Sequence, residues 1–158
     1  MAKTTRATQA LDRVKIKYQV FTYDYDPSAD KIGEHAAACL GAPASTVLKT
    51  LMMLVDARPV CVLVPSDRQA SLKKVAAAMK GKSAEMMKPA EAERVTGYLV
   101  GGISPFGQKR QYPILVETGA LAHEEVFLNG GGRGVQVRLD PKQIIQTLGG
   151  VAADVLAE

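Results

Sequence analysis

Val47-Leu-Lys-Thr-Leu-Met-Met-Leu-Val55 and Val60-Cys-Val-Leu-Val64 are two apolar runs, and Asp56-Ala-Arg-Pro59 separates them. Short runs of apolar residues bounded by turn-forming residues are typical of buried β-strands. The Asp and the Pro between them indicate a turn. We therefore predict that residues 47–64 form a β-hairpin.

The sequence on either side of this hairpin predicts further strands and helices. Asp30 is placed to cap a helix that runs through Leu40, and Asp140-Pro141 is typical of a helix start, with Asp140 as the cap and Pro141 at the first helical position. Ser71 opens a helix that Gly81 ends, with buried positions expected at Leu72, Val75, Ala76 and Met79. The remaining expected elements are helices over 5–15, 89–97 and 141–148, and strands over 18–24, 84–87, 113–117, 125–129 and 135–139.

Length and composition favour one globular domain. The chain has 158 residues, of which 47% are hydrophobic and 23% charged. We predict a single domain over residues 1–158 of the α/β (α+β) class, with helices around a mixed, barrel-like sheet. No apolar run is long enough to span a membrane, and no apolar core follows the charged N-terminus. We therefore expect a cytoplasmic protein.

The metal-ligating and nucleophilic residue types show no catalytic spacing. Cys39 and Cys61 stand outside any CxxC pattern, and the apolar surroundings of Cys61 favour a small buried hydrophobe. Neither His35 nor His123 has a carboxylate or cysteine arranged around it. We expect chemistry without a metal, a cofactor or a histidine-based triad.

The charge is modestly basic and unevenly distributed. The net charge is +4, and residues 32–100 carry nine Lys or Arg against six Asp or Glu, whereas residues 101–158 carry five against six. Such an excess either attracts a polyanion through phosphate contacts or is an ordinary solvated surface. The sequence contains no aromatic-rich RNA-binding motif.

Glycine is concentrated in the segment Gly97-Tyr-Leu-Val-Gly-Gly-Ile-Ser-Pro-Phe-Gly-Gln-Lys-Arg110 and in Gly130-Gly-Gly-Arg-Gly134. Nine of the fourteen glycines lie between Gly97 and Gly134. Alone, such a segment is more often a surface loop. The concentration predicts that two loops converge on one site and present backbone amides to a ligand.

Lys49 interrupts the first apolar run of the hairpin. By strand periodicity it shares a face with Leu51 and Met53. A lysine in this setting either extends from a strand edge into solvent or serves as a pocket cation that fixes a phosphate or polarises a carbonyl.

These segments together resemble the YbaK/EbsC family of Cys-tRNA(Pro) deacylases, which is related to the editing domain of bacterial prolyl-tRNA synthetases. The resemblance rests on Val47–Leu51, Leu72–Ala76, Thr96–Lys109 and Asn129–Gly134, and it covers nearly the whole chain from Tyr18 onward. It implies a single α/β domain with a barrel-like sheet. It also implies trans-editing, in which cysteine wrongly attached to tRNA(Pro) is removed without a metal.

The resemblance also implies a set of site residues. Lys49, Gly101 and Gly102 take the catalytic positions, the two glycines through their backbone amides. The substrate-binding positions are Tyr23, Thr50, Ile103, Ser104, Pro105, Asn129, Gly130 and Gln136. This chain departs from the family pattern at Asn129, where serine is usual, at Gln136, where aspartate is usual, and at Ile32, where phenylalanine is common.

The family mechanism uses the thiol of the esterified cysteine as the nucleophile, so the enzyme needs to supply only orientation, a cation and oxyanion donors. Removal of alanine or serine from tRNA(Pro), in which a water must attack, is an alternative. So is a non-catalytic module that binds an aminoacyl nucleotide. The expected partners are misacylated tRNA(Pro), contacted through the basic first two thirds of the chain, and prolyl-tRNA synthetase; DNA and membranes are not expected. The oligomeric state is left open.

Overall fold

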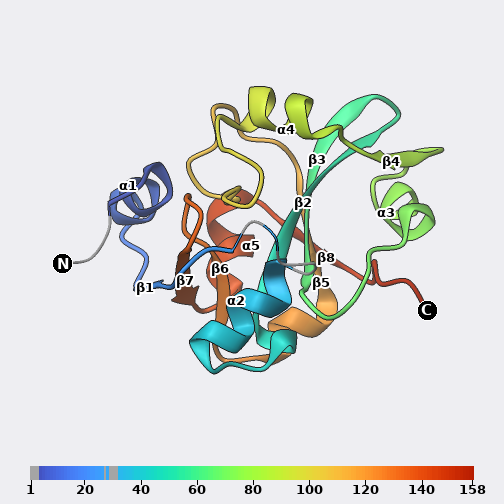
Figure 1. The fold of residues 1–158 in the computed structure, drawn as a ribbon. Coiled ribbons are helices and arrows are strands. Elements are labelled where there is room, and N and C mark those ends of the chain that lie inside the picture. The colour runs from blue at the N-terminus through green and yellow to red at the C-terminus, as the bar shows by residue number, and fades with distance from the viewer. Residues whose placement is uncertain (1–3, 27, 29–31) are drawn as a thin grey trace.

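The predicted hairpin forms the centre of the larger of two β-sheets (Figure 1). A computed structural model of the protein describes residues 4–26, 28 and 32–158, with the side chain of Ile32 excluded. Strands β2 (Leu48–Val55) and β3 (Arg58–Pro65) pair antiparallel, with Lys49 opposite Val64. Asp56 and Ala57 form the turn with φ of 48° and 67°, the left-handed backbone that a two-residue hairpin turn requires.

The larger sheet is mixed, in the order β4-β2-β3-β5-β8. The short strand β4 (Ala84–Met86) adds antiparallel to the end of β2, whereas β5 (Ile114–Glu117) and β8 (Val151–Ala153) add in parallel on the side of β3. The sequence does not predict β8, because it is a three-residue edge strand with two exposed residues that directly follows Gly149-Gly150.

The smaller sheet is antiparallel, in the order β1-β7-β6. Its strands are β1 (Gln19–Thr22), β6 (Val126–Asn129) and β7 (Val135–Leu139). A single parallel bridge between Val47 and Phe127 joins the two sheets just before β2 begins. The predicted class, a single mixed α/β domain, is confirmed, with the strands divided between two connected sheets.

Helices pack around these sheets (Figure 1). They are α1 (Arg6–Arg13), α2 (Ile32–Leu40), α3 (Leu72–Ala78), α4 (Pro89–Thr96) and α5 (Lys142–Leu148), with 3-10 turns at η1 (Ala44–Thr46) and η2 (Thr118–Ala122). Ser71 caps α3 as predicted, its hydroxyl accepting a hydrogen bond from the Lys74 amide at 3.2 Å. The predicted cap of α2, Asp30, lies outside the described residues.

Two details of the helix predictions are wrong. Pro141, not Asp140, occupies the N-cap position of α5, although the Asp140 carboxylate does accept a hydrogen bond from the Lys142 amide at 2.9 Å. Leu72 is 41% exposed, whereas Val75 and Ala76 of the same helix are buried. Leu72 is the first residue of α3, and the helix turns this end toward solvent while burying the next turn.

The main core lies between the larger sheet, the smaller sheet, α1 and α5. Leu63, Phe106, Leu128 and Ile144 are buried there with at most 1% exposure. Cys61 belongs to this core and has no exposure, and burial raises the pKa of its thiol to about 12. The interpretation of Cys61 as a buried hydrophobe is confirmed. Within the described residues, no helix has the length and apolar character needed to cross a membrane.

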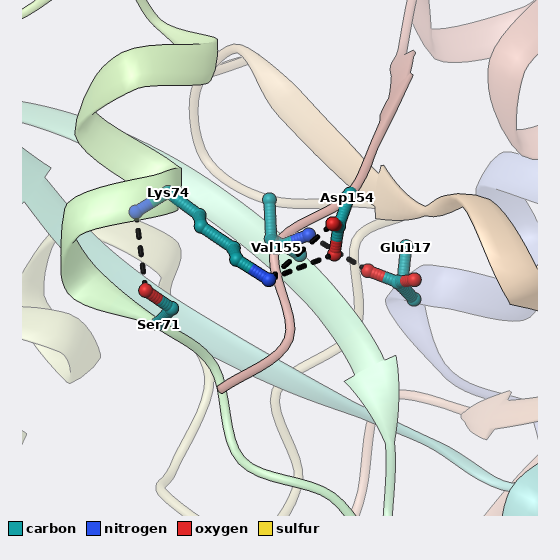
Figure 2. Close-up of polar contacts among 5 residues, drawn as sticks. All are labelled: Ser71, Lys74, Glu117, Asp154 and Val155. Carbon is teal, nitrogen blue, oxygen red and sulfur yellow. Dashed lines mark hydrogen bonds and ion pairs between the residues drawn. The ribbon is translucent and has the colours of Figure 1, made fainter. Parts of the chain in front are cut away.

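The C-terminal segment is fixed across the larger sheet by polar contacts (Figure 2). The carboxylate of Glu117, at the end of β5, accepts a buried hydrogen bond of 2.8 Å from the amide of Val155, whose carbonyl accepts from the Ser71 amide at 2.7 Å. Lys74 forms an ion pair of 3.3 Å with Asp154 on the surface of the same segment. Because that pair is exposed to solvent, the buried Glu117 contact is the stronger tether.

We expect replacement Glu117→Ala to lower the free energy of unfolding by about 1–3 kcal/mol, because it leaves the buried Val155 amide without its acceptor. Urea unfolding measures the change. Glu117→Gln keeps an acceptor oxygen and should cost less, and Glu124→Ala, at an exposed position, is the matched control. Equal unfolding midpoints for Glu117→Ala and the wild type would contradict this account of the tether.

Candidate functional site

A cavity of about 270 Å³ opens where the start of β2 meets the smaller sheet, α2 and the loop that follows α4. Its lining consists of Tyr23, Tyr25, Gly33, Ala36, Val47, Leu48, Lys49, Thr50, Leu51, Val100, Gly101, Ile103, Asn129 and Gln136. The sequence-predicted site residues Tyr23, Lys49, Thr50, Gly101, Ile103, Asn129 and Gln136 are therefore brought together. Segments far apart in the sequence build one cavity.

The two glycine-rich loops meet at the rim of this cavity. The Asn129 side chain joins them: its Nδ2 donates to the Gly101 carbonyl at 3.0 Å, and its Oδ1 accepts from the amides of Gly131 and Gly132 at 2.7 and 3.1 Å. A Cβ on Gly102 would lie 2.9 Å from the backbone of Gly132, a contact that only glycine avoids. The predicted convergence of the two loops is confirmed.

The contacts of Asn129 give a physical reason for the departure from serine at this position. A side-chain amide supplies a donor and an acceptor at once, and Asn129 uses both between the two loops. A serine hydroxyl is shorter and carries one proton, so it would not reproduce this pair of contacts in the same geometry.

Other predicted residues lie outside the cavity lining. The amide of Gly102 donates to the Leu99 carbonyl at 2.8 Å, so it is already engaged in a turn. Ser104 is fully buried, and its hydroxyl accepts from the Phe106 amide at 3.2 Å. Pro105 is buried, and the Gly130 amide pairs with the Val135 carbonyl at 2.8 Å. These four residues shape the loops; within the described residues, the neighbouring amides of Gly101 and Ile103 donate to no protein acceptor.

Two residues of the cavity lining carry a buried oxygen atom that has no hydrogen-bond partner among the described residues. Thr50 Oγ1 and Gln136 Oε1 are inaccessible to solvent and form no hydrogen bond with the described residues. Buried polar atoms are almost always hydrogen-bonded, because an unpaired one costs about 1–3 kcal/mol. Both residues line the cavity, and because both oxygens are shielded from solvent, a polar ligand reaches them only after the side chains that cover them move.

Tyr23 is the third polar group in this part of the cavity. Burial raises the pKa of the Tyr23 phenol, while a hydrogen bond from the Gln136 side chain acts in the opposite direction. Tyr23 therefore stays protonated at neutral pH and can act as a hydrogen-bond donor to a ligand, but not as a base.

Lys49 is half-buried and lines the cavity from β2. β4 pairs with β2 only from Met53 to Val55, so no strand of the larger sheet covers this side of β2 at Lys49. The side chain thus borders the cavity at the open part of a central strand. This placement fits the prediction of a pocket cation better than that of an edge lysine reaching into solvent.

The ionisable lining residues are Lys49, Tyr23 and Tyr25; among the described residues, no Asp, Glu, His or Cys lines the cavity. His35 and Cys39 lie nearby on α2, with Cys39 Sγ 3.6 Å from His35 Nε2, but neither belongs to the lining. No group of three or more His, Cys, Asp or Glu in the described part of the chain is arranged to hold a metal ion.

Sequence reasoning missed Tyr25, which lies at the cavity rim. Its ring lies beneath the Arg133 guanidinium, 5.4 Å from the ring centroid, and Arg133 Nε donates to the Val100 carbonyl at 3.0 Å. The signal was present in the sequence, because Tyr23 and Tyr25 are two residues apart and an extended backbone puts such residues on one face.

Comparison with known proteins finds similarity to aminoacyl-tRNA editing domains. The aminoacyl-tRNA editing domain matches residues 26–147. EbsC of Enterococcus faecalis, which is provisionally named a Cys-tRNA(Pro)/Cys-tRNA(Cys) deacylase, is 31% identical over 96% of this chain and 92% of its own length. Proline–tRNA ligase of Nitratidesulfovibrio vulgaris is 37% identical over 51% of this chain, a match that spans 14% of that enzyme.

A solved structure described as a candidate trans-editing enzyme for prolyl-tRNA synthetase has the same fold. Its TM-score is 0.81 with 23% identity, and the likeness covers 97% of this chain and 96% of the other. The match to the editing-domain family spans most of the chain, and the relative EbsC is similar over nearly its full length. The chain belongs to the YbaK-like family of aminoacyl-tRNA editing domains.

Proposed function

We propose that this chain is a deacylase that releases cysteine from misacylated Cys-tRNA(Pro). The observation that carries the proposal is the composition of the cavity: a lysine and unpaired buried oxygens are present, whereas none of its described lining residues is a carboxylate, imidazole or thiol. Such a cavity can bind and orient an aminoacyl ester, and its described lining residues offer no strong side-chain nucleophile or base. The attacking group then comes from the substrate.

The esterified cysteine carries its own nucleophile. Its sulfur attacks the ester carbonyl carbon, the C–S bond forms, and the C–O bond to the ribose breaks. The thiol proton leaves with the released ribose hydroxyl, so the products are a cyclic thiolactone and tRNA(Pro), and the atoms balance without water. Fixing the thiol near the carbonyl is the main contribution required of the protein.

The cavity residues take roles that suit this step. The charge of Lys49 stabilises the developing oxyanion or the adjacent phosphate, and the amides of Gly101 and Ile103 are available as donors to the carbonyl oxygen. The cavity volume of about 270 Å³ lies just below the usual range for small-molecule sites. It suits the aminoacyl group, with the nucleoside at the rim beside Tyr25.

Removal of alanine or serine is the second candidate, and the unpaired oxygens favour it. Thr50 Oγ1 and Gln136 Oε1 could hold a water molecule once the side chains that shield them from solvent move. That water would replace the thiol as the nucleophile. Both routes act on misacylated tRNA(Pro), and both belong in the cytoplasm, where tRNA is aminoacylated.

We expect Gln136→Leu to lower kcat/KM for Cys-tRNA(Pro) by about 10-fold to 100-fold while lowering the free energy of unfolding by no more than about 1 kcal/mol. Leucine removes a buried acceptor oxygen that has no partner among the described residues, and the folded protein loses only the hydrogen bond from the Gln136 side chain to Tyr23. The substrate would lose its contact with the same side chain. Deacylation rates test the expected loss of activity, and urea unfolding of the same variant tests the expected stability. Gln146→Leu, on the exposed surface of α5, is the control.

A loss of stability without a loss of activity would show that Gln136 is a structural residue. The direct test of the proposed function is deacylation of Cys-tRNA(Pro) with detection of the thiolactone. Absence of turnover on this substrate would contradict it.

A further inference from the structure

A second cavity, of about 630 Å³, lies at the opposite end of the β2–β3 hairpin from the candidate site. The hairpin turn, the end of α3 and the segment 110–113 form it. Its charged and aromatic lining residues are Asp56, Arg58, Lys80, Arg110 and Tyr112, and we call this cavity the basic groove. The proposed deacylation chemistry does not use it.

The positive charges of the basic groove are available to a ligand. Within the described residues, Arg58, Lys80 and Arg110 form no ion pair, and all three are exposed. The one carboxylate in the lining, Asp56, is held by backbone amides: it accepts from Lys82 at 3.0 Å and from Ser83 at 3.1 Å. The groove is therefore cationic, because the Asp56 carboxylate is engaged by backbone amides next to the hairpin turn.

The end of α3 places Lys80 at the groove. Lys80 has φ of 58°, and the amides of Lys80 and Gly81 donate to the carbonyls of Ala77 and Ala76 at 3.0 and 2.8 Å, the hydrogen bonds of a Schellman motif. The left-handed backbone therefore belongs to the helix ending, and the Lys80 side chain lines the groove from there.

We propose that the basic groove binds the phosphate backbone of the tRNA whose 3′ end occupies the candidate site. The proposal rests on the proposed function and extends it to how the rest of the RNA is held. Arginine matches phosphate geometry, and three cations that form no ion pair with the described residues suit a polyanion rather than a neutral metabolite. The groove would account for part of the basic excess in residues 32–100.

The spacing of the two cavities fits a nucleic acid. Lys49 lines one and Val55 the other, and six residues of extended strand span about 20 Å. At about 3.4 Å per stacked nucleotide, this distance corresponds to about six nucleotides. The groove would thus contact the acceptor stem, beyond the reach of an isolated aminoacyl nucleoside.

The test compares two triple variants. Arg58→Gln/Lys80→Gly/Arg110→Gln neutralises the groove, and Arg13→Gln/Lys73→Gln/Lys142→Gln neutralises the same number of exposed cations elsewhere. Affinity for uncharged tRNA(Pro) is measured over a range of KCl concentrations. The logarithm of the binding constant falls linearly with the logarithm of the salt concentration. We expect the groove variant to reduce the magnitude of this slope by about 2–3, and the control to reduce it by less than 1. Equal slopes for the two variants would overturn the proposal.

Lys80→Gly alone separates binding from folding. Glycine relieves the left-handed backbone, so the unfolding temperature should rise by about 2–4 °C while the salt slope falls by about 1. A stabilised variant with an unchanged slope would contradict a phosphate contact at Lys80.

A substrate pair keeps this proposal distinct from the deacylase proposal. In the groove variant, the ratio of kcat/KM for full Cys-tRNA(Pro) to that for a cysteinyl CCA trinucleotide should fall at least about tenfold. Absence of turnover on every acylated RNA would contradict the deacylase proposal. The salt dependence of binding to uncharged tRNA would still test the groove. Unchanged RNA binding together with weaker association with prolyl-tRNA synthetase would assign the groove to an acidic protein and overturn the RNA proposal.

Discussion

Lys49→Ala should reduce kcat/KM for deacylation of Cys-tRNA(Pro) by at least about 100-fold. Lys49 is the only lysine or arginine among the described residues that line the candidate site, and its side chain borders the cavity from a central strand. Loss of a preorganised charge beside a developing oxyanion typically lowers the rate by two to three orders of magnitude. Single-turnover deacylation with excess enzyme measures the effect on the chemical step.

The matched control is Lys73→Ala, which removes an exposed lysine from α3. It should deacylate at the wild-type rate. Circular dichroism should show that Lys49→Ala remains folded, because the half-buried side chain lies at a cavity rather than in the closed core. Wild-type activity in a folded Lys49→Ala protein would contradict the proposed site.

Blocking the thiol of the substrate should have a still larger effect. S-methylcysteinyl-tRNA(Pro) retains the ester, the amino group and nearly the same shape, but its sulfur can no longer attack the carbonyl. We expect its deacylation by the wild-type protein to be slower by about 1,000-fold or more, since an oriented intramolecular nucleophile is worth at least that factor. Parallel measurements with Cys-tRNA(Pro) give the reference rate.

Two outcomes separate the candidate nucleophiles. A strong loss with the methylated substrate, together with thiolactone formation from the native one, supports attack by the thiol. Similar rates for both substrates would instead show that water attacks, which would favour the reading in which Thr50 and Gln136 hold that water.

Much of the fold was predictable because its signals are local. Apolar runs and a turn define the β2–β3 hairpin, and Ser71 and Gly97 mark the ends of α3 and α4 through a cap and a left-handed residue. Strand β8 was not predictable in the same way. Its three residues join the sheet through parallel pairing with β5, a partner distant in sequence, and two of them remain exposed.

The members of the candidate site were predictable in part: seven of the predicted residues line the cavity, whereas Gly102, Ser104, Pro105 and Gly130 do not, and Tyr25 was missed. The lysine and the two glycine-rich loops could be assigned to one site, and the cavity brings them together. Which amides face a ligand depends on backbone geometry: Gly102 turns its amide to Leu99, whereas Gly101 keeps its own free of protein acceptors among the described residues. No sequence pattern distinguishes these two neighbouring glycines.

The departures at Asn129 and Gln136 acquire different meanings in the structure. Asn129 forms hydrogen bonds with both glycine-rich loops, so it holds the two loops together at the cavity rim. Gln136 leaves its oxygen without a hydrogen-bond partner among the described residues, and it offers a neutral acceptor where the resemblance implies a carboxylate. Of the two positions, Gln136 is therefore the one that we expect to affect which amino acid is accepted.

The most direct test of the central claim is a deacylation panel of Cys-, Ala-, Ser- and Pro-tRNA(Pro) at equal concentrations. A cavity that orients the ester without a side-chain nucleophile predicts rapid release of cysteine and release of the other three amino acids slower by at least about 100-fold. Equal or faster release of alanine or serine would contradict substrate-thiol assistance.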